Sequence, residues 1–186
     1  MEFNWNRLEY HSKITSGGLM TEQLETAEFT DTLQFRLGRK IADGGMGSVY
    51  EATIFGSEGF EKTVALKTIR EKFTGDQDFV ELFIGEAKLV ANLVHQNIVQ
   101  IYKLGKWGKS FYIAMEYVNG VNFQQFMNRH LELGIKVPVE LGVFIISRIC
   151  RGLEYAHSKK DTFGNSLSVV HRDVSPKNLI ISAEGE

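Results

Sequence analysis

Cysteine, proline and long apolar runs are scarce in this sequence of 186 residues. It contains one cysteine, Cys150, and two prolines. A lone cysteine excludes an internal disulfide and favours a reducing compartment, so we expect a cytoplasmic location and a buried thiol inside an apolar helix. No apolar run approaches the length of a membrane span, and the first residues lack the apolar segment of a signal peptide, so we expect no membrane segment.

Positive and negative charges are also nearly balanced. The 21 basic and 23 acidic side chains leave a formal net charge of −2. Such a small charge creates no strong field for nucleic acid or a membrane surface, and we expect no nucleic-acid partner. Apolar residues make up 43% of the chain, which is ordinary for a globular protein with a real core.

Composition and periodicity divide the chain into three segments. Residues 1–34 carry six acidic and two basic side chains with weak periodicity, so we expect a flexible acidic extension. Residues 35–118 alternate in the manner of strands, with one helical stretch. Residues 119–186 are mainly helical and end in a polar loop.

This polar loop, His171 to Asn178, carries the most evident chemistry of the chain. It reads HRDVSPKN and lies between Val169-Val170 and the run Leu179 to Ile181, which predicts a loop held between two short strands. A carboxylate and a carboxamide five positions apart, Asp173 and Asn178, can aim at a hydroxyl and hold a metal. The loop matches the signature H-R-D-L-x-x-x-N, with valine in place of leucine.

The sequence therefore resembles the eukaryotic-like protein kinase family, most closely its bacterial serine/threonine branch. The resemblance implies an α+β, two-lobe fold. Residues 35–118 would form a complete small lobe, with a five-stranded antiparallel sheet and one helix, and the hinge. Residues 119–186 would form a truncated helical large lobe. The implied activity is transfer of the γ-phosphate of ATP, with Mg²⁺, to a serine or threonine hydroxyl of a protein substrate.

A glycine-rich turn between two predicted strands, residues 35–41 and 48–53, resembles the phosphate loop of that family. It fits G-x-G-x-x-G-x-V, except that an alanine fills the first glycine position. Glycine lets backbone N–H groups approach phosphate oxygens without obstruction by side chains. The resemblance assigns ATP binding to the turn and its flanks, namely Ile41, Ala42, Asp43, Gly44, Gly45, Met46, Gly47, Ser48 and Val49.

The third predicted strand, residues 63–69, matches the V-A-I-K motif and places Lys67 among core residues, where an ammonium needs a partner. Asp76 can cap a helix over about residues 79–93. Its predicted apolar face contains a single acid, Glu86, among Phe79, Leu82, Phe83, Leu89, Val90 and Leu93. An acid in an apolar stripe favours a cation as its neighbour. The resemblance pairs Glu86 with Lys67, which would hold the α- and β-phosphates.

Two further strands, residues 98–103 and 110–115, lead into a segment that ends in glycine, where two lobes could hinge. In the resemblance, the adenine edge meets the backbone here, and apolar residues lie above and below the base. The implied residues are Ala65, Met115, Glu116, Val118, Asn122 and Ile180. Beyond the hinge, residues 123–133 predict a short helix. Pro138 opens a longer one to about residue 157 that should be buried.

In the resemblance, Asp173 orients the substrate hydroxyl and Asn178 binds Mg²⁺. Serine/threonine members usually carry a lysine two residues after the aspartate, where this chain has Ser175. Lys177 either replaces that cation, as an arginine does in tyrosine kinases, or is a solvent-facing lysine. Arg172 implies control by a phosphate on an activation loop.

No D-F-G, activation loop or A-P-E occurs in the 186 residues. We therefore expect a fragment of a longer kinase that is inactive by itself. Two alternatives stay open: a pseudokinase-like scaffold that binds nucleotide without transfer, and a small-molecule phosphotransferase of related fold. The intact catalytic residues favour a kinase, and Arg172 with the glycine turn favours a protein substrate.

Overall fold

The structure, a computed structural model, describes residues 34–45 and 47–185. The expected extension of residues 1–34 therefore lies almost wholly outside the described residues, and so does Met46. No helix in the described part of the chain is both long and apolar enough to cross a membrane.

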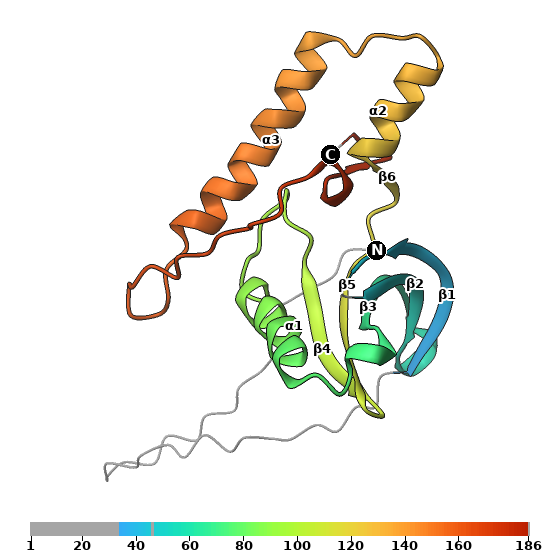
Figure 1. The fold of residues 1–186 in the computed structure, drawn as a ribbon, viewed down its shortest axis with the longest axis vertical. Helices are drawn as coiled ribbons and strands as arrows, with labels where there is room; N and C mark the ends of the chain where they lie inside the picture. Colours follow the sequence, from blue (N-terminus) through green and yellow to red (C-terminus); the bar gives the residue numbers. More distant parts are fainter. Residues whose placement is uncertain (1–33, 46, 186) are drawn as a thin grey trace, which may run out of the picture. The chain divides into compact units, whose positions relative to one another are not determined.

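A five-stranded antiparallel sheet forms the first half of the fold, as predicted (Figure 1). Its strands are β1 (Gln34–Asp43), β2 (Gly47–Phe55), β3 (Glu61–Ile69), β4 (Ile101–Trp107) and β5 (Ser110–Glu116). Their order across the sheet is β1-β2-β3-β5-β4. Short 3₁₀ turns follow β2 (Ser57–Gly59) and β3 (Glu71–Phe73). β3 is thus central, with both edges paired.

Alternation along β3 separates two apolar clusters on the two faces of the sheet. Val64 and Leu66 are buried in one cluster, beneath the partly buried rings of Phe35 and Tyr112. Ile69 belongs to the other cluster, which the helix α1 (Gln77–Val90) covers. Lys67 shares the alternation of Ile69, so the fold directs it toward α1.

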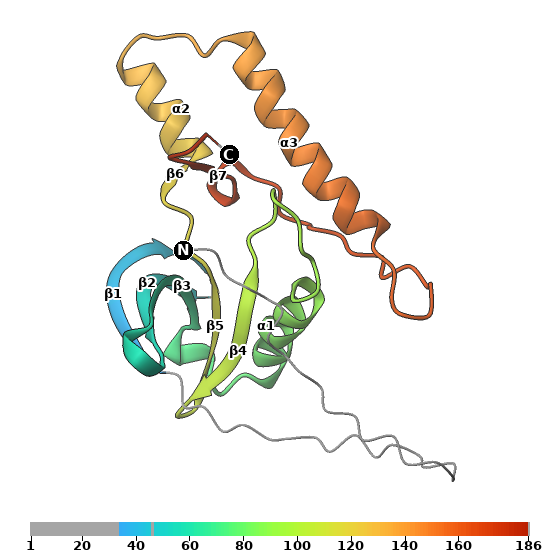
Figure 2. The same ribbon diagram turned by 180° about the vertical axis from the view of Figure 1, so that it is seen from behind.

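The helix α1 is capped by the preceding residue, Asp76, whose Oδ1 accepts a hydrogen bond of 3.2 Å from the N–H of Phe79. This cap was predicted, and the predicted apolar face is confirmed at Phe83 but wrong at Leu82 and Leu89. Leu82 is 62% exposed, whereas Phe83 is 1% exposed and packs with Ala87 on the sheet. The buried stripe therefore passes beside Glu86 instead of through it. In Figures 1 and 2 the helix lies along β4.

A second, two-stranded antiparallel sheet joins β6 (Gly120–Asn122) to β7 (Ile180–Ser182) (Figure 2). The prediction of a strand at Val169-Val170 was wrong, because neither residue lies in a strand. Val169 is buried in a cluster with Leu93 and Ala156. Side-chain packing therefore anchors one end of the polar loop, and a strand anchors the other.

Two helices, α2 (Phe123–Glu132) and α3 (Val139–Ser158), follow β6. Pro138 precedes the first turn of α3, as predicted. The expectation that α3 is buried was wrong for the described residues, since only Gly152 and Ala156 are buried. Cys150 is likewise exposed and not a core thiol. The reason is that the described elements pack on one side of the helix only, through Ala156 and Leu93.

Candidate functional site

Lys67 and Glu86 form an ion pair between β3 and α1. The Lys67 Nζ lies 2.7 Å from Oε1 and 3.0 Å from Oε2 of Glu86. The Lys67 side chain is 22% exposed and that of Glu86 is 49% exposed. The ring of Phe83 lies 5.7 Å from the same Nζ. The ammonium is therefore fixed from one side, while the carboxylate keeps contact with solvent.

The glycine turn between β1 and β2 is closed by its own backbone. The N–H of Gly44 donates to the carbonyl of Gly47 over 2.9 Å. Gly47 is buried, and a Cβ there would lie 2.1 Å from the carbonyl oxygen of Thr68, so no other residue fits. The pairs Ala42–Val49 and Asp43–Ser48 face each other across the hairpin. Ile41, Ala42, Asp43, Gly44 and Gly45 are exposed, whereas Ser48 is buried.

Three donors hold the carboxylate of Asp43 in this turn. Its Oδ1 accepts from Ser48 Oγ at 2.9 Å and from Arg70 at 2.8 Å, and Lys40 lies 3.5 Å from Oδ2. The Ser48 hydrogen bond, then the charges of Arg70 and Lys40, hold the pKa of Asp43 below its usual value. Sequence reasoning missed Arg70. The antiparallel register could have found it, because Gly47 faces Ile69 and the next residue lies beside the turn.

The hinge segment follows β5. Glu116 donates its N–H to the carbonyl of Gln100 over 2.8 Å, and Arg39 donates to the hydroxyl of Tyr117 over 3.1 Å. Hydrogen bonds to Tyr117 and then Glu51 raise the pKa of Arg39 above its usual value. The N–H of Val118 has no hydrogen-bond partner in the described part of the chain. It is therefore available to an acceptor on a ligand.

The remaining predicted adenine and ribose residues occupy two places. Ala65 on β3 is buried and pairs with Met115 on β5, which is half-buried. Ile180 on β7 pairs with Asn122 on β6. The Oδ1 of Asn122 accepts from the N–H of Gln125 at 2.8 Å and caps α2. This capping uses one acceptor site of the Asn122 side chain and leaves its amide nitrogen for a further contact.

In the polar loop, Asn178 and Asp173 are held together. The Nδ2 of Asn178 donates to Asp173 Oδ2 at 2.8 Å and to the Asp173 carbonyl at 3.0 Å. Asn178 ends a 3₁₀ turn, Pro176–Asn178, in which its N–H donates to the carbonyl of Ser175. Arg172 has a φ of 63°, in the left-handed region, and is exposed. Lys177 is exposed, with no ion pair among the described residues.

The backbone connects this loop to the hinge. The carbonyl of Leu179 accepts from the N–H of Phe123 at 2.8 Å, and that of Asn119 accepts from Ala183 at 2.7 Å. With the β6–β7 ladder, these bonds place the residues after Asn178 beside the residues after Val118. No hydrogen bond joins Asp173 or Asn178 to the Lys67–Glu86 pair among the described residues.

The residues of the polar loop would fit a magnesium ion. Asn178 turns its amide nitrogen toward Asp173, so Asn178 Oδ1 keeps no protein partner among the described residues and is the oxygen that would hold the ion. Carboxylate and carbonyl oxygens suit Mg²⁺, which commonly takes one or two protein ligands and completes its shell with phosphates and water. The described residues contain no cluster of three or more His, Cys, Asp or Glu side chains around a possible metal.

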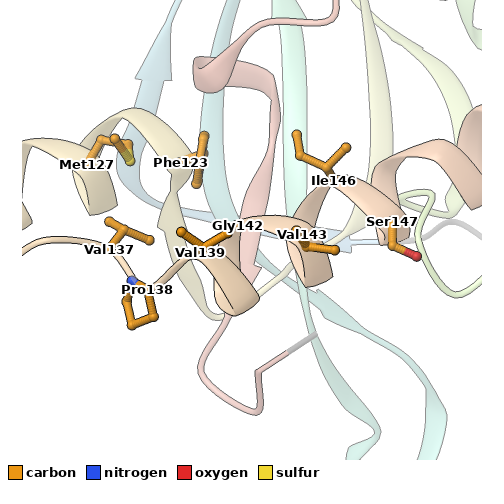
Figure 3. A pocket seen from close by; sticks show the side chains of 9 residues that line it. All are labelled: Phe123, Met127, Val137, Pro138, Val139, Gly142, Val143, Ile146 and Ser147. Atoms are coloured by element: carbon orange, nitrogen blue, oxygen red, sulfur yellow. The ribbon is translucent and has the colours of Figure 1, made fainter.

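A cavity of about 640 Å³ lies elsewhere, between α2 and α3 (Figure 3). Its lining is almost wholly apolar: Phe123, Met127, Val137, Pro138, Val139, Gly142, Val143, Ile146 and Ser147. None of the predicted ATP-binding or catalytic residues lines it. A cavity without charged groups does not suit a triphosphate, so its size does not make it the nucleotide site.

Comparison with known proteins decides the family. A family model described as the protein kinase domain matches residues 35–186. The chain belongs to the protein kinase family. The α+β kinase fold expected from the sequence is thereby confirmed, including the sheet with its helix α1 and the first helices of the large lobe.

Curated kinases of bacteria are similar over most of this kinase chain. The tyrosine-protein kinase MasK of Myxococcus xanthus is 39% identical over 150 residues, covering 81% of this chain and 23% of MasK. The serine/threonine-protein kinase PknD of Chlamydia trachomatis is 33% identical over 160 residues, covering 82% of this chain and 16% of PknD. The chain thus spans less than a quarter of the length of these relatives.

A solved structure gives the same result at the level of the fold. The PknI kinase domain of Mycobacterium tuberculosis superimposes with a TM-score of 0.64 at 26% sequence identity. The match covers 83% of this chain and 57% of the PknI chain. The arrangement of the described elements is therefore that of a kinase small lobe followed by the first part of a large lobe.

Proposed function

We propose that this kinase domain binds ATP with Mg²⁺ and transfers the γ-phosphate to a serine or threonine hydroxyl of a protein. The Lys67–Glu86 ion pair carries this proposal. This lysine is held by two short contacts beside a buried phenylalanine. It therefore offers a fixed positive charge on β3, the strand that pairs with β2 after the glycine turn. Fixed charges of this kind stabilise phosphoryl transfer with little covalent work by the protein.

The nucleotide would lie along the inner face of the small lobe. Backbone N–H groups of the turn other than that of Gly44, which donates to Gly47, would meet the phosphates, with Lys67 at the α- and β-phosphates. The N–H of Val118, which has no partner among the residues that the structure describes, would donate to the adenine edge. Further contacts to the base or ribose are proposed for Val49, Ala65, Met115, Glu116, Asn122 and Ile180.

The polar loop would supply the transfer chemistry. Asp173 would orient the substrate hydroxyl and accept its proton, while Asn178 would hold Mg²⁺ through its free Oδ1. The hydrogen bond from Asn178 to Asp173 Oδ2 fixes that carboxylate and leaves Oδ1 for the substrate. Bound Mg²⁺ would neutralise charge on the phosphates. A reducing compartment supplied with ATP, as the cytoplasm is, suits this activity and the single free thiol.

A tyrosine hydroxyl is the second candidate acceptor. The relative MasK, 39% identical to this chain, is named a tyrosine-protein kinase. The sequence agrees in one respect, because Ser175 stands where serine/threonine kinases usually carry lysine, and the exposed Lys177 follows two residues later. The relative PknD, which is named a serine/threonine-protein kinase, is 33% identical to this chain.

Phosphoamino-acid analysis tests the proposal. The protein encoded by the whole gene would be incubated with γ-labelled ATP, Mg²⁺ and a generic basic protein, beside its Asp173→Asn variant. We expect labelled serine or threonine, lost in the variant. Labelled tyrosine would select the second candidate. Absence of transfer by a protein that still binds ATP would support the pseudokinase alternative and reject the proposed activity.

A further inference from the structure

A carboxylate stands directly before the first glycine of the turn that, in the proposed function, holds phosphates. Asp43 is exposed, and its lowered pKa keeps it ionised at neutral pH. Like charges repel, so a free carboxylate beside a triphosphate would oppose nucleotide binding. The chain nevertheless carries an acid here, which makes the partners of Asp43 informative.

Those partners hold the Asp43 carboxylate from two other segments. Ser48 on β2 is the one buried polar residue among those described, and its hydroxyl donates to Oδ1 at 2.9 Å. Arg70 directly follows β3 and reaches the same oxygen at 2.8 Å. The Asp43 carboxylate thus connects the turn to β3. Lys67 lies on the same strand, three residues before Arg70.

We propose that Arg70 is a positioning residue for the nucleotide, acting through Asp43. From the end of β3, Arg70 neutralises the carboxylate. The turn can then present its N–H groups to phosphates without repulsion from Asp43. The inference rests on the proposed function, and it assigns a role to a cation outside the family motifs.

Two other roles for Arg70 make different predictions. Arg70 could contact a phosphate itself, in which case Asp43 competes with the nucleotide for it. The contact could also be a plain surface pair, since the side chains of Arg70 and Asp43 are 37% and 49% exposed. Exposed pairs often contribute little to stability. A double-variant cycle separates the three roles.

Calorimetric titration at low ionic strength is the test. ATP with Mg²⁺, ADP and adenosine would be titrated into the full chain and its Arg70→Ala, Asp43→Asn and doubly substituted variants. Arg70→Ala should weaken ATP binding by about three- to tenfold, ADP binding less, and adenosine binding not at all. The double variant should bind ATP within about twofold of the unchanged chain, and Arg70→Lys should retain most of the affinity.

Controls make each outcome decisive. Lys136→Ala removes an exposed cation between α2 and α3 and should leave all three affinities unchanged. A double variant as weak as Arg70→Ala would overturn the proposal in favour of a direct phosphate contact. An Arg70→Ala variant that behaves like Lys136→Ala would overturn it in favour of a surface pair. Should Arg70→Ala not fold, weaker ATP binding by Asp43→Asn would still refute the neutralising role.

The Lys67→Met variant separates this inference from the proposed function. If Lys67→Met loses the preference for ATP over adenosine while Arg70→Ala keeps it, only the role of Arg70 fails. If neither variant changes that preference, the phosphate site itself is wrong.

Discussion

Lys67 contacts both carboxylate oxygens of Glu86, at 2.7 and 3.0 Å, although the Glu86 side chain is half exposed. An exposed acid gains little from an ion pair unless its geometry is fixed. Here the sheet fixes the geometry, because Phe83, on the preceding turn of α1, is buried against Ile69 and Ile113 of the sheet. The docking of α1 therefore sets the position of the Glu86 carboxylate that holds the lysine.

The first prediction concerns this docking. Phe83→Ala should lower the free energy of unfolding by about 3–5 kcal/mol, because it empties a filled core position. The neighbouring Leu82→Ala, on the exposed side of α1, should cost less than about 0.5 kcal/mol. Urea denaturation followed by circular dichroism measures both. Equal losses in the two variants would show that α1 presents a different face to the sheet.

The second prediction concerns the loop after α3. The Oδ1 of Asp161 accepts from the N–H groups of Phe163 and Asn165, and its Oδ2 from the Asn165 side chain. These bonds, that of the Asn165 side chain first, lower the pKa of Asp161. A lowered folded-state pKa stabilises the loop above the unfolded value of about 4, and this stabilisation is lost as the pH falls through the folded value.

NMR can follow that titration. The amide shifts of Phe163 and Asn165 should change with a midpoint below about pH 4, and they should not change in Asp161→Asn over that range. A midpoint at or above the ordinary aspartate value would mean that the Asp161 hydrogen bonds do not hold in solution.

The third prediction concerns Asn178. Asn178→Ala removes both the proposed magnesium ligand and the hydrogen bond to Asp173. Added Mg²⁺ should then increase the ATP affinity of this variant of the full chain roughly tenfold less than it does that of the unchanged chain. This is the size of effect expected when one contact to a charged group is lost. Asn128→Ala, an exposed asparagine of α2, is the matched control and should behave as the unchanged chain. An undiminished magnesium effect in Asn178→Ala would remove this residue from the metal site.

The fourth prediction concerns the cation of the polar loop. In the protein encoded by the whole gene, Lys177→Ala should reduce turnover more than Ser175→Ala. Loss of a preorganised contact to the γ-phosphate would cost about 2–4 kcal/mol of transition-state stabilisation. Steady-state kinetics with saturating ATP gives the comparison. Small and equal effects would make Lys177 a solvent-facing lysine.

Local patterns in the sequence predicted most of the sheet and the cap of α1. Alternation along β3 and the oxygen of Asp76 act within a few residues, so one segment contains the whole signal. The same reasoning placed the apolar face of α1 correctly at Phe83 but extended it to the wrong neighbour, because Leu82 fits a helical apolar stripe as well as Ala87 does. Only the sheet opposite decides between the two faces.

Longer-range features could not be predicted in this way. Arg70 meets Asp43 across 27 positions of sequence, through the register of two hairpins. Val169 is buried by Leu93 and Ala156, residues of a distant turn and helix, and not by strand pairing. The Lys67–Glu86 pair was expected from motifs that the family shares. Periodicity of the chain alone placed Glu86 in an apolar stripe that favours a cation, but it did not identify Lys67 as that cation.

Nucleotide titration of Lys67→Met tests the central claim most directly, that the Lys67–Glu86 pair forms a phosphate site. The full chain should bind ATP with Mg²⁺ more tightly than adenosine. Lys67→Met should lose roughly ten- to hundredfold in ATP affinity, the scale of a hydrogen bond to a charged group, and keep its adenosine affinity. A Lys67→Met variant that folds and retains the unchanged chain's preference for ATP over adenosine would contradict the account.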